Sequence, residues 1–292
     1  MLFLAILTAC APPATASPTD TFIPTSTTIP TQTVLPNCER QDDLIQQACI
    51  SLATGLDYWA YVPSETSAPS ATLPLLVYLH GSSRIGSNLK LLLGEGVPAE
   101  IEKGRTLAMV VASPQCPFGE NWQSVEMVER LSQFVDEVVA AYHLDSARVS
   151  LTGFSMGGDG VWALGRAHSE QFAALAPVSS DWYSHDPANM CVLRDTPIWV
   201  FQSQVDEVVS PKYAQQNVAE IQGCGGSQIR LTIFPTGGHE ATARQVYGMD
   251  ELYQWFQKKM KGLFGQRLLD KGSFKEKGTI SFSLLSSPCH FV

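Results

Sequence analysis

Between residues 57 and 261 the sequence alternates short apolar runs with longer segments of helical periodicity, and this alternation constrains the fold more than any other feature. Apolar runs bounded by turn residues are typical of strands that are covered on both faces. The predicted strands are 57–62, 73–79, 106–112, 148–152, 172–177, 197–202 and 229–234, and the predicted helices are 125–142, 156–168, 211–222 and 250–261. Because a crossover helix joins two parallel strands, the pattern predicts an α/β fold with a mostly parallel central sheet flanked by helices.

The length allows one large or two small globular domains, and the composition argues against two other classes of protein. The 292 residues are 45% hydrophobic, which is enough for a substantial core. The 28 acidic and 19 basic residues give a formal charge of −9, whereas a nucleic-acid-binding protein needs a basic surface. We therefore expect no nucleic-acid partner. No apolar stretch approaches the roughly 18 residues that a membrane-spanning helix requires.

The first residues are typical of a targeting signal rather than of a folded domain. An apolar run over 2–9 ends in Leu7-Thr8-Ala9-Cys10, which resembles the lipobox of bacterial lipoproteins. The resemblance implies a signal peptide at 1–9 and a lipidated Cys10, with a plain secretory signal as the alternative. It further implies an exported protein that a lipid anchor holds on the extracytoplasmic side of a membrane, or one that is secreted.

Two segments flank the predicted domain, which we place at 38–261. Residues 10–37 are rich in proline, threonine and serine, so they bury little apolar surface and are expected to form an extended tether. Residues 262–292 are basic and then rich in serine, without amphipathic periodicity. We expect this tail to be peripheral or disordered.

The cysteine spacing predicts disulfides and no metal site. The predicted pairs are Cys191 with Cys224 and Cys38 with Cys49, because Cys191 and Cys224 precede successive strands that should be neighbours in a parallel sheet. Buried free thiols remain the alternative for either pair. No Cys/His cluster has the spacing of a zinc site, and we expect neither a metal nor a cofactor.

The strongest chemical signal is the pentapeptide Gly153-Phe154-Ser155-Met156-Gly157. It follows a predicted strand and opens a predicted helix, which is the setting of a nucleophilic serine on a tight turn. A helix N-terminus there stabilises negative charge near the serine oxygen. A serine nucleophile needs a general base and an acid that orients it. Asp206 follows one later strand and His239 follows the last, in a predicted loop, so we expect Ser155, His239 and Asp206 to form a triad.

A second group of residues is expected around the reacting ester. His80-Gly81-Ser82 ends a predicted strand, at the position where the backbone N–H of Ser82 would join that of Met156 in an oxyanion hole. The side chains predicted to contact substrate are His80, Trp122, Trp182 and Tyr183. Loop aromatics more often serve in packing, so a structural role is the alternative for the last three.

Five ordered motifs carry a resemblance to a known family. LPLLVYLHGS, VVASPQCP with Trp122, VSLTGFSMGGDGVWALG, TPIWVFQSQVDEVVSP and FPTGGHEA followed by ELYQWF resemble α/β-hydrolases of the secreted carboxylesterase branch, also labelled predicted peptidases. That branch is similar to polyhydroxyalkanoate depolymerases and to feruloyl and acetylxylan esterases. The resemblance implies the same triad. The chain departs from the family at Gln202-Ser203 and at Asp159, and neither departure is expected to touch the triad.

The predicted activity is that of a serine carboxylesterase on short-chain carbohydrate- or aryl-linked esters, including polysaccharide-linked ones. The segment between Pro177 and Thr196 is too short for a large cap domain, which favours an open cleft. Two alternatives stay open: a serine peptidase on the same fold, and a catalytically silent lipoprotein that binds a partner at the cell surface.

Overall fold

The computed structural model describes residues 37–40, 43–64, 73–180, 182 and 187–261. The chain divides into two units, residues 1–32 and 33–292, and every described residue belongs to the second. The predictions for the signal peptide, Cys10, the tether up to residue 36 and the tail 262–292 lie outside the described residues. Within the described ranges, no helix is long and apolar enough to cross a bilayer.

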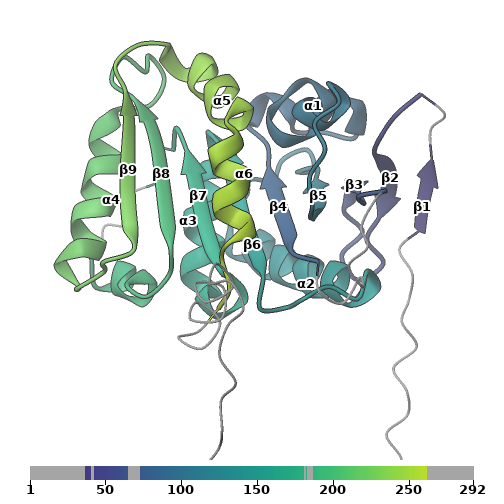
Figure 1. Ribbon diagram of the computed structural model, residues 1–292, viewed down its shortest axis with the longest axis horizontal. Helices are drawn as coiled ribbons and strands as arrows, with labels where there is room; N and C mark the ends of the chain where they lie inside the picture. The colour runs from purple at the N-terminus through teal and green to yellow at the C-terminus, as the bar shows by residue number, and fades with distance from the viewer. Residues whose placement is uncertain (1–36, 41–42, 65–72, 181, 183–186, 262–292) are drawn as a thin grey trace, which may run out of the picture. The chain divides into compact units, whose positions relative to one another are not determined.

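The described part of the chain forms a nine-stranded sheet in the order β1-β2-β3-β5-β4-β6-β7-β8-β9 (Figure 1). Strands β4 to β9 are parallel to their neighbours in this set, and β1, β2 and β3 pair antiparallel along one side. The strands are β1 (Asn37–Arg40), β2 (Gln47–Ile50), β3 (Asp57–Tyr61), β4 (Leu75–Leu79), β5 (Val110–Pro114), β6 (Val149–Phe154), β7 (Ala174–Val178), β8 (Ile198–Ser203) and β9 (Ile229–Phe234). The prediction of a mostly parallel sheet is confirmed.

Helices cover both faces of this sheet. The α-helices are α1 (Gly96–Glu102), α2 (Val125–Ala141), α3 (Met156–Ala167), α4 (Pro211–Gly223), α5 (Gly238–Gly248) and α6 (Asp250–Gln257). Short 3-10 turns are η2 (Ser82–Arg84), η3 (Leu89–Gly94), η4 (Ser169–Gln171) and η5 (Pro187–Leu193). Helices α2, α3 and α4 pack in one apolar cluster, and α1, α5 and α6 pack in another on the opposite face. Figure 1 shows α6 in front of the middle of the sheet.

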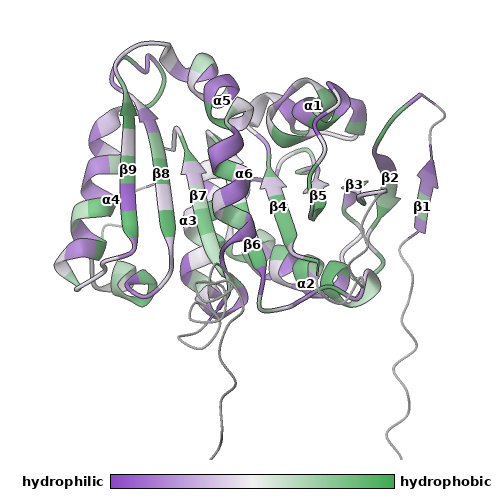
Figure 2. Cartoon of the chain, viewed as in Figure 1, coloured by the Kyte–Doolittle hydropathy of each residue, from purple (hydrophilic) through white to green (hydrophobic). Residues whose placement is uncertain are grey.

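Strand β4 shows how the sequence places the two cores. Successive side chains of a strand point to opposite faces. Leu75, Val77 and Leu79 accordingly pack in the cluster of α2, α3 and α4. Leu76 and Tyr78 pack in the cluster of α1, α5 and α6. Both faces of the strand are buried, and four of its five residues are aliphatic, the exception being Tyr78; Figure 2 accordingly colours most of the strand green.

The structure differs from the sequence predictions at several elements. Strand β5 begins and ends later than the predicted strand 106–112. It extends to Pro114 because the backbone there still pairs with Tyr58 of the antiparallel β3. Strands β1 and β2 and helices α1 and α5 were not predicted. The two strands are only four residues long, and α5 begins at glycines that are more typical of a loop.

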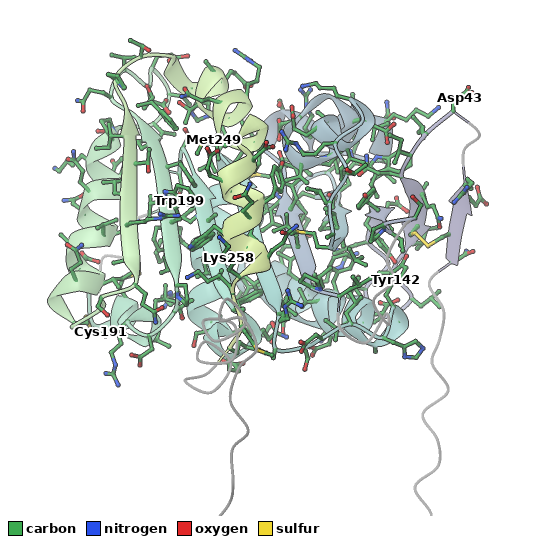
Figure 3. All side chains as sticks on the ribbon, in the orientation of Figure 1. Asp43, Tyr142, Cys191, Trp199, Met249 and Lys258 are labelled. Atoms are coloured by element: carbon green, nitrogen blue, oxygen red, sulfur yellow. A yellow bond between two sulfur atoms is a disulfide. The ribbon has the colours of Figure 1, made fainter. Side chains whose placement is uncertain are left out.

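Both predicted disulfides are present. Cys38 in β1 bonds to Cys49 in β2, directly across the antiparallel pair, and Figure 3 draws this bond in yellow. Cys191 in η5 bonds to Cys224, the residue directly after α4. Cys116 is a buried free thiol. Disulfides persist mainly in oxidising compartments, so this pattern favours an exported protein.

We expect loss of the Cys191–Cys224 bond to lower stability more than loss of the Cys38–Cys49 bond. The sequence separations are 33 and 11 residues, and the entropy that a cross-link removes from the unfolded chain rises with loop length. The expected losses in the free energy of unfolding are about 4 and about 3 kcal/mol. Urea denaturation of the two paired Cys→Ser variants measures them, and the reverse order would contradict the expectation.

Candidate active site

Ser155 occupies a strained turn between β6 and α3. Its backbone has φ 54° and ψ −123°, a conformation that side-chain-bearing residues rarely adopt. Its N–H donates to the carbonyl of Val178 in β7 (2.9 Å), and its own carbonyl accepts the N–H of Asp159 (3.1 Å). The side chain is therefore held at the carboxyl edge of the sheet, at the first turn of a helix, as predicted from the sequence.

Glycine is required on both sides of this serine because backbones meet there. A Cβ at Gly153 would lie 2.3 Å from the carbonyl oxygen of Gly157. A Cβ at Gly157 would lie 2.0 Å from the carbonyl oxygen of Leu79, at the end of β4. The first turn of α3 is thus packed directly against the backbone that leads into His80.

The structure brings Ser155, His239 and Asp206 together in one hydrogen-bonded chain. The Oγ of Ser155 lies 3.0 Å from Nε2 of His239, and Nδ1 of that ring lies 2.9 and 3.0 Å from the two carboxylate oxygens of Asp206. A carboxylate only accepts hydrogen bonds, so Nδ1 carries the proton and Nε2 is free to accept the serine hydroxyl. This is the arrangement in which an imidazole can act as a base toward a hydroxyl.

The carboxylate of Asp206 is buried and fully surrounded by donors. Its side chain is 0% exposed. One oxygen accepts the backbone N–H groups of Val208 (3.0 Å) and Val209 (2.8 Å), and the other accepts the side-chain amide of Gln202 (3.2 Å). These bonds stabilise the charged form of a group that burial alone would penalise. Gln202 therefore contacts the proposed acid, and the expectation that this departure leaves the triad untouched is wrong.

His239 lies in the first turn of α5 rather than in a loop, which corrects the sequence prediction. Gly237 and Gly238 precede it with φ 113° and 60°, values that glycine adopts without strain. The carboxylate of Glu207 accepts the backbone N–H of His239 (3.1 Å) and so caps the helix. The two neighbouring acids thus differ in role: Asp206 contacts the ring, and Glu207 contacts the backbone.

His80 and Trp122 are not placed to contact substrate. Both side chains are 0% exposed. The Nδ1 of His80 bonds to the carbonyl of Gly81 (2.7 Å), and its Nε2 accepts the N–H of Cys116 (2.9 Å). The indole N–H of Trp122 donates to the carbonyl of His80 (3.0 Å). The prediction of a substrate contact is corrected: these polar atoms are engaged with protein groups in the interior.

The buried imidazole of His80 makes stability sensitive to acid. Burial lowers the pKa of His80 from 6.5 to about 4, because the protonated ring would lose its hydration. The unfolded chain binds this proton near pH 6.5 and the folded chain resists it, so stability falls as pH drops from about 6.5 toward 4. Between pH 7 and pH 5 we expect a loss of about 2 kcal/mol from this group.

Urea unfolding of the wild type and of His80→Gln at both pH values measures this contribution. The glutamine variant lacks the titrating ring, so its stability should fall less over the same interval by about 2 kcal/mol. Equal losses in the two proteins would contradict the assignment.

The two expected oxyanion donors lie on adjoining segments. Ser82 begins η2 directly after Gly81, and Met156 begins α3 directly after Ser155. Within the described ranges, neither backbone N–H donates to a protein acceptor. A Cβ at Gly81 would lie 3.3 Å from the ring of Phe154, and that ring lies 4.7 Å from the ring of His239. The turn at Gly81 is thus adjacent to the triad.

Trp182 contacts protein groups on several sides, and Tyr183 lies outside the described residues. The N–H of Trp182 donates to the buried carboxylate of Asp159 (3.0 Å), and its carbonyl accepts the amide of Asn217 (2.8 Å). Its half-buried ring lies 5.5 Å from the guanidinium of Arg166. Asp159, the second departure from the family pattern, therefore anchors the backbone that carries Trp182.

Glu95 is a buried acid that no local sequence pattern indicated. One carboxylate oxygen accepts the N–H of Gly81 and the hydroxyl of Tyr78, each at 2.8 Å, and the other lies 3.4 Å from Nε of Arg84. Burial raises the pKa of this carboxyl, and the two donated hydrogen bonds oppose the rise. Its distance along the chain from Gly81 left no local signal in the sequence.

Groups of acidic, histidine and cysteine side chains that could hold a metal ion are not found among the described residues. Neither a model of a known protein family nor a curated relative matches the sequence.

Solved structures do show similarity to this chain. A thermostable esterase gives a TM-score of 0.61 at 23% identity, over 75% of this chain and 64% of its own, so this chain spans less than two thirds of that protein. An acetyl xylan esterase from Aspergillus awamori gives a TM-score of 0.53 at 15% identity, and the match covers 69% of this chain and 95% of that esterase. A ferulic acid esterase gives a TM-score of 0.54 at 15% identity, and the match covers 80% of this chain and 100% of that esterase. The likeness is one of fold alone: the chain shares the fold of these esterases, the α/β-hydrolase fold that its five motifs predict.

Proposed function

We propose that this protein is an exported serine carboxylesterase with Ser155 as nucleophile, His239 as general base and acid, and Asp206 as the acid that orients the imidazole. The observation that carries the proposal is the hydrogen-bonded chain from Ser155 Oγ through His239 to Asp206. It is seated on a strained turn at a helix N-terminus, which is the setting that activates a serine in α/β-hydrolases.

The geometry supports a two-step acyl transfer. Ser155 Oγ attacks the ester carbonyl carbon while its proton passes to Nε2 of His239, and the carbonyl π electrons move to the oxygen. The N–H groups of Ser82 and Met156 stabilise that oxyanion. Its collapse breaks the bond to the alcohol, which takes the proton from His239. Water then repeats the sequence on the acyl-enzyme, releasing the acid and restoring the serine.

We infer an open cleft at the carboxyl edge of the sheet, and this inference is the basis for the proposed substrate class. Between Val178 and Ile198 the chain has room for η5 and loop but not for a separate cap domain. We propose short-chain esters carried by carbohydrate or aryl groups, including polysaccharide-linked ones. The acetyl xylan and ferulic acid esterases named above share the fold, which makes these the first substrates to test. We further propose that Cys10 carries a lipid anchor. The Cys10→Ser variant lacks the lipidated thiol, so it should no longer bind to membranes.

Intact-mass analysis of the full-length chain treated with a fluorophosphonate tests the proposal. Such reagents phosphonylate activated serines with loss of fluoride, so we expect one adduct per chain, mapped to Ser155 and absent from Ser155→Ala. Hydrolysis of aryl acetates, acetylated xylan, a feruloylated sugar and peptides is then measured with the same protein preparation before labelling.

Each outcome has a definite meaning. An adduct together with ester hydrolysis supports the esterase. An adduct with hydrolysis of peptides but not of esters would replace it with a serine peptidase. Absence of an adduct in folded protein would overturn catalysis and favour a silent surface-binding protein.

A further inference from the structure

Two consecutive peptide groups between β4 and η2 are held in place by buried side chains. In the first, between His80 and Gly81, the carbonyl accepts the indole N–H of Trp122 (3.0 Å). The N–H of the same peptide donates to a carboxylate oxygen of Glu95 (2.8 Å). Both polar groups of this peptide are therefore fixed, from opposite sides.

The second peptide joins Gly81 to Ser82, and among the described residues its carbonyl has hydrogen-bond partners whereas its N–H has none. That carbonyl accepts Nδ1 of His80 (2.7 Å) and the N–H of Arg84 (3.1 Å). The N–H and C=O of a planar trans peptide point in opposite directions. The N–H of Ser82 is consequently directed away from the His80 ring and remains available.

The protonation state of His80 is set by its two partners. A carbonyl oxygen can only accept, so Nδ1 carries the proton, and the backbone N–H of Cys116 donates to the unprotonated Nε2 (2.9 Å). The ring is 0% exposed and packs edge-on against Trp122, with 5.1 Å between ring centroids. The donor that holds the Gly81 carbonyl therefore has one orientation and one tautomer.

The turn formed by His80, Gly81 and Ser82 lies against the turn that carries Ser155. Gly157, in the first turn of α3, is packed on the carbonyl groups of Leu79 and His80, where an added Cβ would lie 2.0 and 2.9 Å away. The Met156 N–H and the Ser82 N–H are thus carried by two backbone segments in direct contact. Rotation of the Gly81–Ser82 peptide would remove one of the two donors.

We propose that His80 is a positioning residue for the oxyanion hole. By donating from Nδ1 to the Gly81 carbonyl, it keeps the Ser82 N–H aimed at the oxyanion, without itself touching the substrate. Glu95 and Trp122 hold the preceding peptide in the same way. This inference rests on the proposed esterase function and gives roles to two residues that the sequence had suggested as substrate contacts.

Two substitutions of His80 separate the two halves of its hydrogen bonding. Asparagine places an amide donor near the position of Nδ1 but leaves the Cys116 N–H without an acceptor. Glutamine reaches the position of Nε2 and can accept from Cys116, but it does not supply the donor at Nδ1. On an aryl acetate we expect His80→Asn to retain kcat within about threefold. We expect His80→Gln to lower kcat about 10- to 100-fold with KM nearly unchanged, since oxyanion donors act in the transition state.

The thermal stabilities of the two variants should be in the opposite order to their kcat values. The unsatisfied Cys116 N–H makes His80→Asn the less stable variant in thermal unfolding. If His80 served packing alone, kcat would instead follow stability, and His80→Gln would be the more active variant. A positioning role therefore predicts that the more active variant, His80→Asn, is the less stable one, whereas a packing role predicts that the more active variant is also the more stable one.

Ser82→Pro supplies the second test, because it deletes the N–H that His80 is proposed to aim. Ser82 is the first residue of η2, where proline is tolerated, and Gly81 has φ −73° and ψ 166°, which suits a residue before proline. We expect kcat to fall by about 10²- to 10³-fold. In the Ser82→Pro background, His80→Gln should lower kcat by less than about twofold further, since both changes act on one donor.

Three results would overturn the inference. They are equal kcat for folded His80→Asn and His80→Gln, a raised KM with unchanged kcat, or a full effect of His80→Gln in the Ser82→Pro background. A wild-type protein that forms no fluorophosphonate adduct would overturn the proposed function and this inference together. Failure of the positioning role alone is recognised by normal labelling of Ser155 alongside any of the three results.

Discussion

Replacing Asp206 with asparagine is expected to lower kcat about ten-thousandfold while leaving the fold intact. The carboxylate oxygen that accepts two backbone N–H groups from Val208 and Val209 fixes which way an asparagine must face. Its carbonyl oxygen keeps those bonds, so its amide takes the other oxygen's place, opposite Nδ1 of His239. An amide N–H then replaces the nearer acceptor of Nδ1, at 2.9 Å in the wild type, which favours the imidazole tautomer whose Nε2 carries the proton. Such a ring cannot accept the proton of Ser155.

Glu207→Gln is the matched control for this prediction. Glu207 is the neighbouring acid, but its carboxylate accepts the backbone N–H of His239, and a glutamine carbonyl can do the same. Its kcat should stay within a few-fold of the wild type. Steady-state hydrolysis of an aryl acetate by both variants decides the matter. A large loss in Glu207→Gln with a small one in Asp206→Asn would move the orienting acid to Glu207.

Gly157→Ala is expected to cause the largest loss of stability of any single methyl addition near the site, about 3 kcal/mol or more. The new Cβ would lie 2.0 Å from the carbonyl oxygen of Leu79 and 2.5 Å from its carbonyl carbon. Both atoms are backbone, so no side chain can rotate away. Either the end of β4, which leads into the turn that carries the Ser82 N–H, or the start of α3, which carries the Met156 N–H, must move, so kcat should fall as well.

Gly223→Ala provides the control for the intrinsic effect of the substitution. Gly223 is the last residue of α4, and apart from its chain neighbours and its own helix backbone no atom of the described residues lies within 4 Å of the place where its Cβ would be. Alanine there should leave the free energy of unfolding unchanged or raise it by up to about 1 kcal/mol. Urea denaturation of both variants measures the contrast. Similar stabilities for the two would contradict the close approach at Gly157.

The sequence was most informative where local pattern and chemistry coincide. The apolar run of β6, the glycines around Ser155 and the helical spacing of α3 predict a strand, a turn and a helix at the observed places. The order of Ser155, Asp206 and His239 along the chain predicted three side chains that the structure brings within hydrogen-bonding distance.

The errors concern features that depend on distant contacts. Whether His80 faces a cleft or the interior is decided by the N–H of Cys116 and the carbonyl of Gly81, and sequence spacing does not encode that orientation. Gln202 was judged remote from the triad, yet the turn after β8 folds back so that its amide reaches Asp206. Glu95 meets Gly81 only because α1 packs beside the end of β4.

The disulfide between the two outermost strands also determines how the domain responds to a pulling force. Among the described strands, β1 lies at the edge of the sheet and has β2 as its one neighbour, so hydrogen bonds alone would let it peel away under tension applied at its N-terminal end. The bond from Cys38 to Cys49 carries that tension directly into β2, bypassing residues 39–48. The hairpin therefore cannot unzip, and the first contacts to bear the force are those between β2 and β3.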